Sequence, residues 1–393
     1  MSRKKVCILV FSQIAYDSRV LREVDLARQH YDVDVIAYGN WQPPEGVTYH
    51  QLAFTPYPDS LRFRWLLPGR MLPALYDRYF WWKPEHNQAL SLLLDGGYDL
   101  VHANDWDSQP VAVKAAREKG FAVLYDCHEY SPEQGANNLV WRMLVKPYRE
   151  YLLRAYNDHI GHITTVSEGL VQLYHKLLGW NPTIIMNAQR YQPVPFRPVD
   201  PQHIRIIHHG VANTSRNLED FLKLVALLDN RFSLTLLFAP GKEQVVADLK
   251  VKANSIAPGR VTFLVPVTPA EIIRTVSQYD IGIPFIRASH LNYVNVLPNK
   301  FFDYLIGGLC LAITPLKMMQ CIVEASGAGI VAEDTSVDTL AKAINSLTPA
   351  QIDACKQHAL ELAKTMNAEA EMAKLLAIYQ SLLAGSMKPE EAA

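Results

Sequence analysis

Residues 297–311 read Leu-Pro-Asn-Lys-Phe-Phe-Asp-Tyr-Leu-Ile-Gly-Gly-Leu-Cys-Leu. Pro298 is typical of the start of a helix, and the Gly307-Gly308 pair is typical of its end, so the pattern predicts a helix over 299–306. A short apolar run over 309–313 follows at once and predicts a buried strand. A helix that leads directly into a fully apolar strand is the repeating unit of doubly wound α/β sheets.

The same alternation extends along the whole chain. In the second half, apolar runs occur at 204–208, 234–238, 261–264, 281–285, 309–313 and 329–331, with helical patterns at 218–228, 269–277, 299–306 and 318–325. In the first half, they occur at 6–11, 33–37, 100–103, 122–125, 163–166 and 183–186. Continuous apolar runs are expected for parallel strands that are covered on both faces. The sequence therefore predicts an α/β protein with two Rossmann-like, doubly wound domains.

A Pro- and Gln-rich stretch around 187–203 separates the two halves and is typical of a linker. We expect an N-terminal domain over 1–190 and a C-terminal domain over 191–367. In such sheets ligands bind beyond the carboxyl ends of the strands. Two such edges facing a central cleft would hold a bipartite substrate, one part in each domain.

Composition excludes several classes of protein. The chain has 393 residues, 38 Lys+Arg against 39 Asp+Glu and 49% hydrophobic residues, which suits two globular domains. The near-zero net charge argues against nucleic-acid binding. Five dispersed cysteines without a CxxC pair indicate neither a disulfide framework nor a zinc site. No apolar run approaches the ~20 residues of a membrane span, and 6–11 is shorter than a signal-peptide core. We therefore expect a cytoplasmic protein.

The 299–306 helix is a candidate anion site. Its first turn presents unpaired N–H groups, to which Lys300 adds a full positive charge. Asp303 falls on the same face, where its carboxylate oxygens can accept hydrogen bonds from a ribose. A surface Lys–Asp pair, stabilising by only about 0.2–0.5 kcal/mol, is the alternative. In the loop after 204–208, Gly210 permits close approach of a ligand and Arg216 suits a phosphate, although a plain βα-loop has the same pattern.

Several phrases resemble glycosyltransferases of the two-Rossmann GT-B architecture, most closely family 4, whose members are retaining and use nucleotide sugars. They are Asp17-Ser-Arg-Val-Leu-Arg-Glu, Tyr98-Asp-Leu-Val-His-Ala-Asn-Asp, Leu124-Tyr-Asp-Cys-His-Glu, Thr165-Val-Ser-Glu-Gly-Leu and the Leu297 stretch. The last is the most specific. The closing segment, about 368–385, resembles the family's C-terminal helix, which implies packing back on the N-terminal domain.

The resemblance implies roles for particular residues. Asp303 matches the family's ribose-binding glutamate with a shorter side chain, and Asn295 stands where the family often has the first of two glutamates. Arg216 matches the lysine of a diphosphate-binding pair whose arginine position is Val211. The implied sites are catalytic His128, Arg216 and Lys300; donor-binding Gly210, Arg216, Asn295, Asn299, Lys300 and Asp303; and acceptor-side Asp17, Arg19 and Glu129, with Glu129 able to orient His128.

No metal or cofactor is expected. Asp105-Trp106-Asp107 has the spacing with which a different glycosyltransferase architecture holds Mn²⁺, but here it follows a strand of the first Rossmann-like half. Residues 61–82 and 140–154 combine aromatic residues with arginines. Such segments either contact a membrane interface or form an acceptor subdomain packed on the sheet.

The sequence thus predicts a metal-independent, retaining hexosyltransferase. It would move sugar from a nucleotide-diphosphate sugar to a sugar, glycolipid or small-molecule acceptor, in polysaccharide or glycolipid synthesis, with a peripheral place at the inner membrane face as one option. Two alternatives stay open. One is a nucleotide-sugar 2-epimerase of the same fold, and the other is a catalytically silent nucleotide-sugar-binding subunit, which Asn295 and Val211 would explain. The sequence leaves the base, sugar, acceptor and oligomeric state undetermined.

Overall fold

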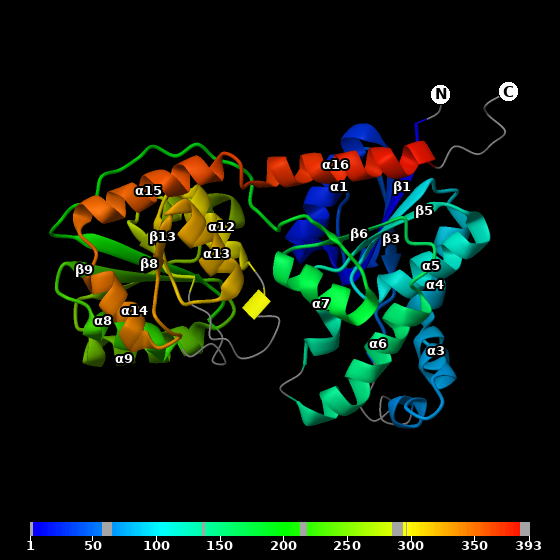
Figure 1. Ribbon diagram of the computed structural model, residues 1–393, viewed down its shortest axis with the longest axis horizontal. Coiled ribbons are helices and arrows are strands. Elements are labelled where there is room, and N and C mark those ends of the chain that lie inside the picture. The colour runs from blue at the N-terminus through cyan, green and yellow to red at the C-terminus, as the bar shows by residue number, and fades with distance from the viewer. Residues whose placement is uncertain are drawn as a thin grey trace. The chain divides into compact units, whose positions relative to one another are not determined.

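The computed structural model describes residues 3–56, 65–135, 138–212, 218–284, 294–295 and 297–385. The chain forms two compact units (Figure 1). The N-terminal unit comprises Met1–Met186 and Met372–Ala393, and the C-terminal unit comprises Asn187–Glu371. Each has its own sheet and core and is described separately below.

The N-terminal unit is built on a seven-stranded, all-parallel sheet with the order β3-β2-β1-β4-β5-β6-β7. Successive side chains of β1 point to opposite faces, as the period of a strand requires. Val6, Ile8 and Val10 therefore enter one core while Cys7 and Leu9 enter another. The strands are β1 (Lys5–Gln13), β2 (Asp32–Tyr38), β3 (Val47–Leu52), β4 (Leu100–Asn104), β5 (Ala122–Asp126), β6 (His162–Thr165) and β7 (Thr183–Ile184).

Helices cover both faces of this sheet. One face packs against α1 (Ser18–His30) and α16 (Ala368–Gly385), whose Leu375, Ile378 and Tyr379 are buried. The other face packs against the remaining helices of the unit. These are α3 (Ala74–Trp81), α4 (Pro84–Asp95), α5 (Ser108–Lys119), α6 (Lys146–Ala155), which follows a π-turn over Trp141–Val145, and α7 (Glu168–Leu178).

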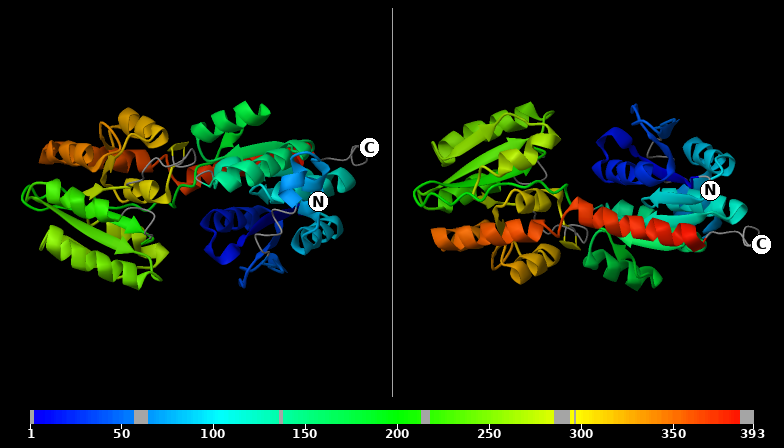
Figure 2. Two further views of the ribbon diagram at one scale, coloured as in Figure 1. Left: turned by 90° about the horizontal axis from the view of Figure 1, so that it is seen from below. Right: turned by 90° about the horizontal axis from the view of Figure 1, so that it is seen from above.

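The C-terminal unit repeats the plan with six parallel strands in the order β10-β9-β8-β11-β12-β13, the Rossmann order. Figure 2 shows α8 and α9 on one side of this sheet and α12, α13 and α15 on the other. The strands are β8 (Ile204–Gly210), β9 (Phe232–Phe238), β10 (Val261–Leu264), β11 (Ile281–Gly282), β12 (Cys310–Ile313) and β13 (Gly329–Val331). The helices are α8 (Glu219–Leu227), α9 (Glu243–Ile256), α10 (Ile272–Val276), α12 (Asn299–Ile306), α13 (Lys317–Ser326), α14 (Val337–Asn345) and α15 (Pro349–Ala363).

The prediction of two Rossmann-like, doubly wound units is confirmed. The predicted helix over 299–306 is α12 to the residue, with Pro298 as its N-cap and Gly307 as its C-cap. One strand was missed, β3, which reads Val-Thr-Tyr-His-Gln-Leu and buries only its two end residues. As an edge strand it is partly solvated, so it lacks the continuous apolar run that marks the central strands.

Candidate functional site

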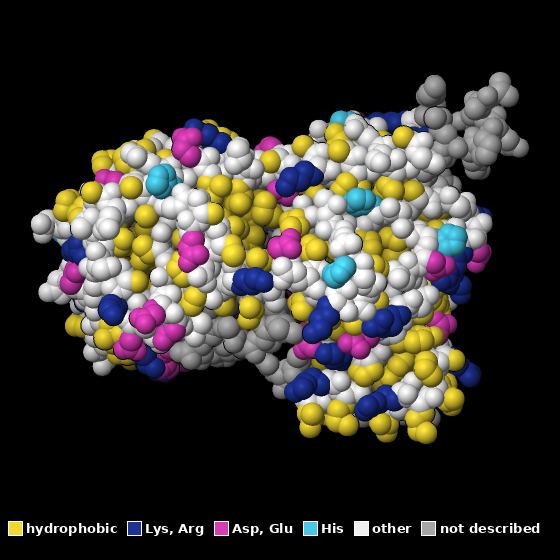
Figure 3. All heavy atoms as spheres, in the orientation of Figure 1, with side chains coloured by type: hydrophobic (Ala, Val, Ile, Leu, Met, Phe, Trp, Pro, Cys, Tyr) yellow, Lys and Arg dark blue, Asp and Glu magenta, His cyan; other side chains and the backbone are white. Residues whose placement is uncertain are grey.

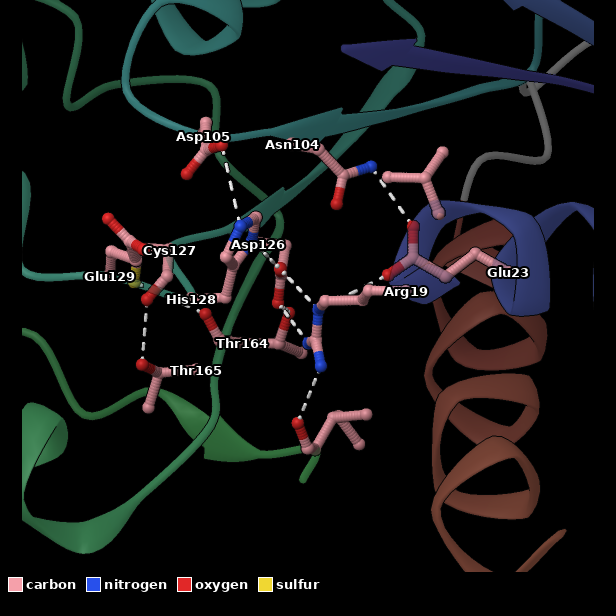
Figure 4. A network of polar contacts seen from close by, with 12 residues as sticks. Arg19, Glu23, Asn104, Asp105, Asp126, Cys127, His128, Glu129, Thr164 and Thr165 are labelled. Atoms are coloured by element: carbon pink, nitrogen blue, oxygen red, sulfur yellow. Dashed lines mark hydrogen bonds and ion pairs between the residues drawn. The ribbon is translucent and has the colours of Figure 1, made fainter. Parts of the chain in front are cut away.

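A network of charged side chains lies at the carboxyl end of the N-terminal sheet (Figure 4). Arg19, near the start of α1, is 5% exposed and donates from Nε and Nη2 to the two carboxylate oxygens of Asp126, at 2.9 and 2.6 Å. Its Nη1 donates to the carbonyl of Ile185 at 2.9 Å. Burial works against the charge of this pair, but Arg19 and His128 together hold the pKa of Asp126 well below its usual range. Such a bidentate pair fixes the orientation of the carboxylate.

His128 lies between two carboxylates. Its Nδ1 is 2.9 Å from Oδ2 of Asp126, and its Nε2 is 3.4 Å from Oδ2 of Asp105. Although burial opposes the charge, Asp105 and Asp126 raise the pKa of His128 to about 10. At neutral pH the ring is therefore an imidazolium, which donates protons in hydrogen bonds and is no general base.

The sequence predicted that Glu129 orients His128, and this is wrong. Asp126 ends β5 and His128 lies two residues beyond it, and the two partners of the His128 ring are Asp126 and Asp105. Glu129 is exposed and accepts a hydrogen bond from Gln134.

Asp105 follows β4 directly and has a left-handed backbone, with φ of 68°. Non-glycine residues rarely adopt this conformation, and it aims the carboxylate at His128. The neighbouring Asp107 has its pKa raised to about 7 by burial and by Asp105. Within the part of the chain that the structure describes, no group of three or more His, Cys, Asp or Glu side chains could hold a metal ion.

The acceptor-side candidates of the first loop have local partners. The carboxylate of Asp17 accepts from the N–H of Val20 at 3.2 Å and from the hydroxyl of Ser12 at 2.7 Å, so it caps α1. Because the guanidinium of Arg19 is buried and bound to Asp126, this geometry favours positioning of the Asp126–His128 pair over direct contact with an acceptor.

Behind Arg19 lies a second buried layer that sequence reasoning missed. Glu23 is 1% exposed, accepts from the amide of Asn104 at 3.0 Å and lies 3.5 Å from both Arg19 and His102. Burial raises the pKa of Glu23 to about 8 and lowers that of His102 to about 4, so both are neutral at pH 7. His102 Nδ1 is 2.8 Å from the hydroxyl of Tyr379 on α16. The layer thus connects the C-terminal helix to the residues around His128.

In the C-terminal unit, the first turns of α12 hold the predicted donor residues. Lys300 is 8% exposed and Asp303 is 5% exposed, so the alternative of a surface ion pair is excluded. Oδ2 of Asp303 lies 3.2 Å from Nε2 of His209, at the end of β8. A cation and a carboxylate are therefore held at a helix N-terminus, where the unpaired N–H groups favour anions.

The other donor candidates vary in placement. Gly210 closes β8 with φ of 148°, which glycine alone adopts readily. Asn299 accepts from Asn187 at 2.9 Å, and Asn295 is 9% exposed. Val211 is half exposed, and Arg216 lies outside the described residues.

Part of the chain matches a known protein family. Residues 24–187 match the Glycosyl transferase 4-like domain. No curated protein matches its sequence.

Solved structures share the fold of this chain over nearly its whole length. Sucrose-phosphate synthase from Thermosynechococcus elongatus matches with a TM-score of 0.72 at 14% identity, covering 98% of this chain and 100% of that one. Trehalose 6-phosphate synthase from Burkholderia multivorans matches at 0.68 and 11%, covering 98% of each chain. Anabaena HepE bound to UDP-glucose matches at 0.65 and 13%, covering 96% and 99%. The predicted GT-B fold is confirmed, and the domain match over residues 24–187 agrees with the predicted resemblance to family 4.

Two residues of the candidate site carried a sequence signal that the prediction did not use. Asp126 stands two positions before His128 where a predicted strand ends, at the edge of the sheet where ligands bind. His209 ends a strand beside Gly210, at the edge where ligands bind in such sheets. Glu23 had no signal, because only the packing of α1 on the sheet buries it.

Proposed function

We propose that this protein is a retaining, metal-independent glycosyltransferase that moves a sugar from a nucleotide-diphosphate sugar to an acceptor held by the N-terminal unit. The observation that carries the proposal is the buried pair Lys300 and Asp303 in the first turns of α12. Charged side chains are seldom buried unless they pair with another group. The Lys300 ammonium with the helix N-terminus suits a diphosphate, and the Asp303 carboxylate suits a ribose.

The departing diphosphate is the difficult charge in such a transfer. Lys300, Arg216 and the N–H groups of the first turn of α12, which begins at Asn299, would stabilise it without a divalent ion. Donors aimed at a developing negative charge are worth about 3–4 kcal/mol each when removed. Gly210 would let the chain approach the donor closely, and Asn295 would take the place of the acidic residue common in the family.

His128 would act as a fixed positive charge near the reacting carbon. Its imidazolium state, maintained by Asp105 and Asp126, supports a role in positioning the sugar or stabilising charge. Glu129, exposed beside it, would contact the acceptor. The retaining course of the reaction follows from the resemblance to family 4, and no nucleophile is assigned.

A uridine nucleotide is the first donor to test. Anabaena HepE, which shares the fold, has been solved with UDP and with UDP-glucose. We propose that this chain likewise binds a nucleotide sugar.

The acceptor would be a polysaccharide precursor or a glycolipid, with the enzyme at a membrane surface. Exposed apolar side chains, here called the apolar tip, precede α3 and α6; they are Leu67, Met71, Leu72, Leu139, Val140 and Met143. An open hollow of about 540 Å³ is lined by Leu67, Pro68, Arg70 and Met71. Figure 3 shows hydrophobic and basic side chains together along the lower edge of the N-terminal unit. None of the described helices is long and apolar enough to cross a membrane.

The decisive experiment measures nucleotide binding and transfer together. UDP, GDP and ADP, with their sugars, are tested by thermal shift, because a ligand that binds only the folded state raises the melting temperature. Transfer from the binding nucleotide sugar is then assayed with a lipid and oligosaccharide acceptor pool. Lys300→Ala should lower turnover by about two to three orders of magnitude, whereas Lys223→Ala, at an exposed position of α8, should not.

The same assays separate the alternatives. An epimerase alters the donor without any acceptor, and a silent subunit binds nucleotide but neither transfers nor hydrolyses it. Normal turnover in Lys300→Ala would overturn the proposed mechanism.

A further inference from the structure

His209 is a buried histidine at the ligand-binding edge of the C-terminal sheet, and the proposed function gives it no role so far. Its side chain is 11% exposed, and Nε2 lies 3.2 Å from Oδ2 of Asp303. The two groups are close but not aligned, and Nε2 forms no hydrogen bond within the described part of the chain. A buried ring nitrogen without a hydrogen bond is uncommon and requires an explanation.

The position of His209 is fixed from a second side. Its backbone N–H donates to the hydroxyl of Tyr304 at 2.9 Å, and the two rings meet edge to face at 5.1 Å. Tyr304 itself is fully buried against Gly282 of β11, where an added Cβ would come within 2.4 Å of the tyrosine ring. Tyr304, which follows Asp303 on α12, thus holds the histidine beside the Asp303 carboxylate.

The chemistry of this pair selects the kind of group that completes it. A carboxylate only accepts hydrogen bonds, and an imidazole N–H donates one. A hydroxyl satisfies both, since it donates to Asp303 and accepts from Nε2–H. A phosphate oxygen only accepts and would be repelled by Asp303, so the phosphates belong at Lys300 and the helix N-terminus.

We propose that His209 and Asp303 act as one unit that binds a ribose hydroxyl of the nucleotide. The inference rests on the proposed nucleotide-sugar function and adds a residue that sets sugar specificity in the donor. The aspartate is one methylene shorter than the glutamate of the family resemblance, and the histidine supplies a second contact to the same hydroxyl. His209 is a positioning residue for Asp303 and a direct donor to the ribose.

The test compares ribose with deoxyribose. Kd is measured by calorimetry for the tightest-binding of UDP, GDP and ADP and for its 2′-deoxy and 3′-deoxy forms. The wild-type protein should prefer the ribonucleotide to at least one deoxy form by about 10- to 100-fold. His209→Ala should lose this preference by weakening the ribonucleotide alone. His209→Gln keeps a side-chain N–H and should restore part of it, and His203→Ala, 81% exposed, serves as the control.

Two additions keep the result decisive. His209→Phe fills the space without a donor and replaces the alanine variant if that protein does not fold. In a double-mutant cycle with Asp303→Asn, the two changes should be strongly non-additive, because both act on one hydroxyl. Equal weakening of ribo- and deoxynucleotides, or an unchanged ribose preference, would overturn the inference while sugar transfer by the wild type leaves the proposed function standing. Absence of binding to every nucleotide would overturn both.

Discussion

The charged residues around His128 form a balanced set at neutral pH. Arg19 and His128 are positive, Asp126 and Asp105 are paired with them, and Glu23 stays neutral behind them because burial raises its pKa to about 8. Because the carboxyl group of Glu23 is neutral, the buried layer needs no second cation to pair with it. Its protonation state should therefore govern how stability depends on pH.

Glu23→Gln should flatten part of that pH dependence. The ordinary pKa of Glu23, taken for the unfolded chain, is 4.5, and the folded value is about 8, so between these values the folded state binds more protons. The Glu23 contribution to stability is thus fully present below pH 4.5 and is lost as pH rises toward 8. The variant lacks this loss, so its stability relative to the wild type should increase between pH 5 and pH 8.5.

Urea denaturation of both proteins at several pH values measures this difference and cancels the other titrating groups. Asp158→Asn serves as a control, since Asp158 pairs with Arg117 at the surface and is 49% exposed. A constant difference between wild type and Glu23→Gln across the range would show that Glu23 is ionised in the folded protein.

At the scale of elements, the packing of α12 on β11 fixes the donor residues. Gly282 has no side chain where Tyr304 lies, and a Cβ there would approach the ring to 2.4 Å. Gly282→Ala should therefore displace α12 and lower the free energy of unfolding by about 1–3 kcal/mol. It should also weaken nucleotide binding, because Lys300 and Asp303 move with the helix.

Denaturation and nucleotide titration of the same variant check both parts of this expectation. Gly385→Ala, where an added Cβ meets nothing within 4 Å, is the matched control and should change neither quantity. Unchanged nucleotide affinity in Gly282→Ala would show that donor binding does not depend on the packing of α12 against β11.

At the scale of the whole molecule, charge is unevenly distributed. The chain has a net charge of -1, yet exposed arginines accompany the apolar tip, namely Arg70, Arg78, Arg142 and Arg154. Apolar side chains rimmed by arginine suit the interface of an anionic bilayer. We expect the protein to sediment with phosphatidylglycerol-containing vesicles at low salt and to be released progressively by salt, since surface attraction is screened within about 10 Å at 0.1 M.

Met71→Glu combined with Leu139→Glu should abolish this sedimentation while leaving the melting temperature unchanged, because both side chains are exposed. Val265→Glu, at an 81% exposed position of the C-terminal unit, controls for added charge. Equal binding of all three proteins to anionic vesicles would exclude the apolar tip as the contact.

The two Rossmann-like units, the central strands and the bounds of α12 follow from the sequence alone, because apolar periodicity and helix-capping residues are local properties of the chain; the edge strand β3 does not, since it is partly solvated. Short phrases at strand ends also carry the resemblance to glycosyltransferases. The contacts between distant residues depend on the packing of the elements: Arg19 lies against Asp126, His102 against Tyr379 and His209 against Asp303, across separations that no local pattern encodes. Burial neutralises Glu23, and burial of Lys300 and Asp303 excludes a surface ion pair between them. Neither could be predicted from the sequence, because desolvation depends on which elements pack together.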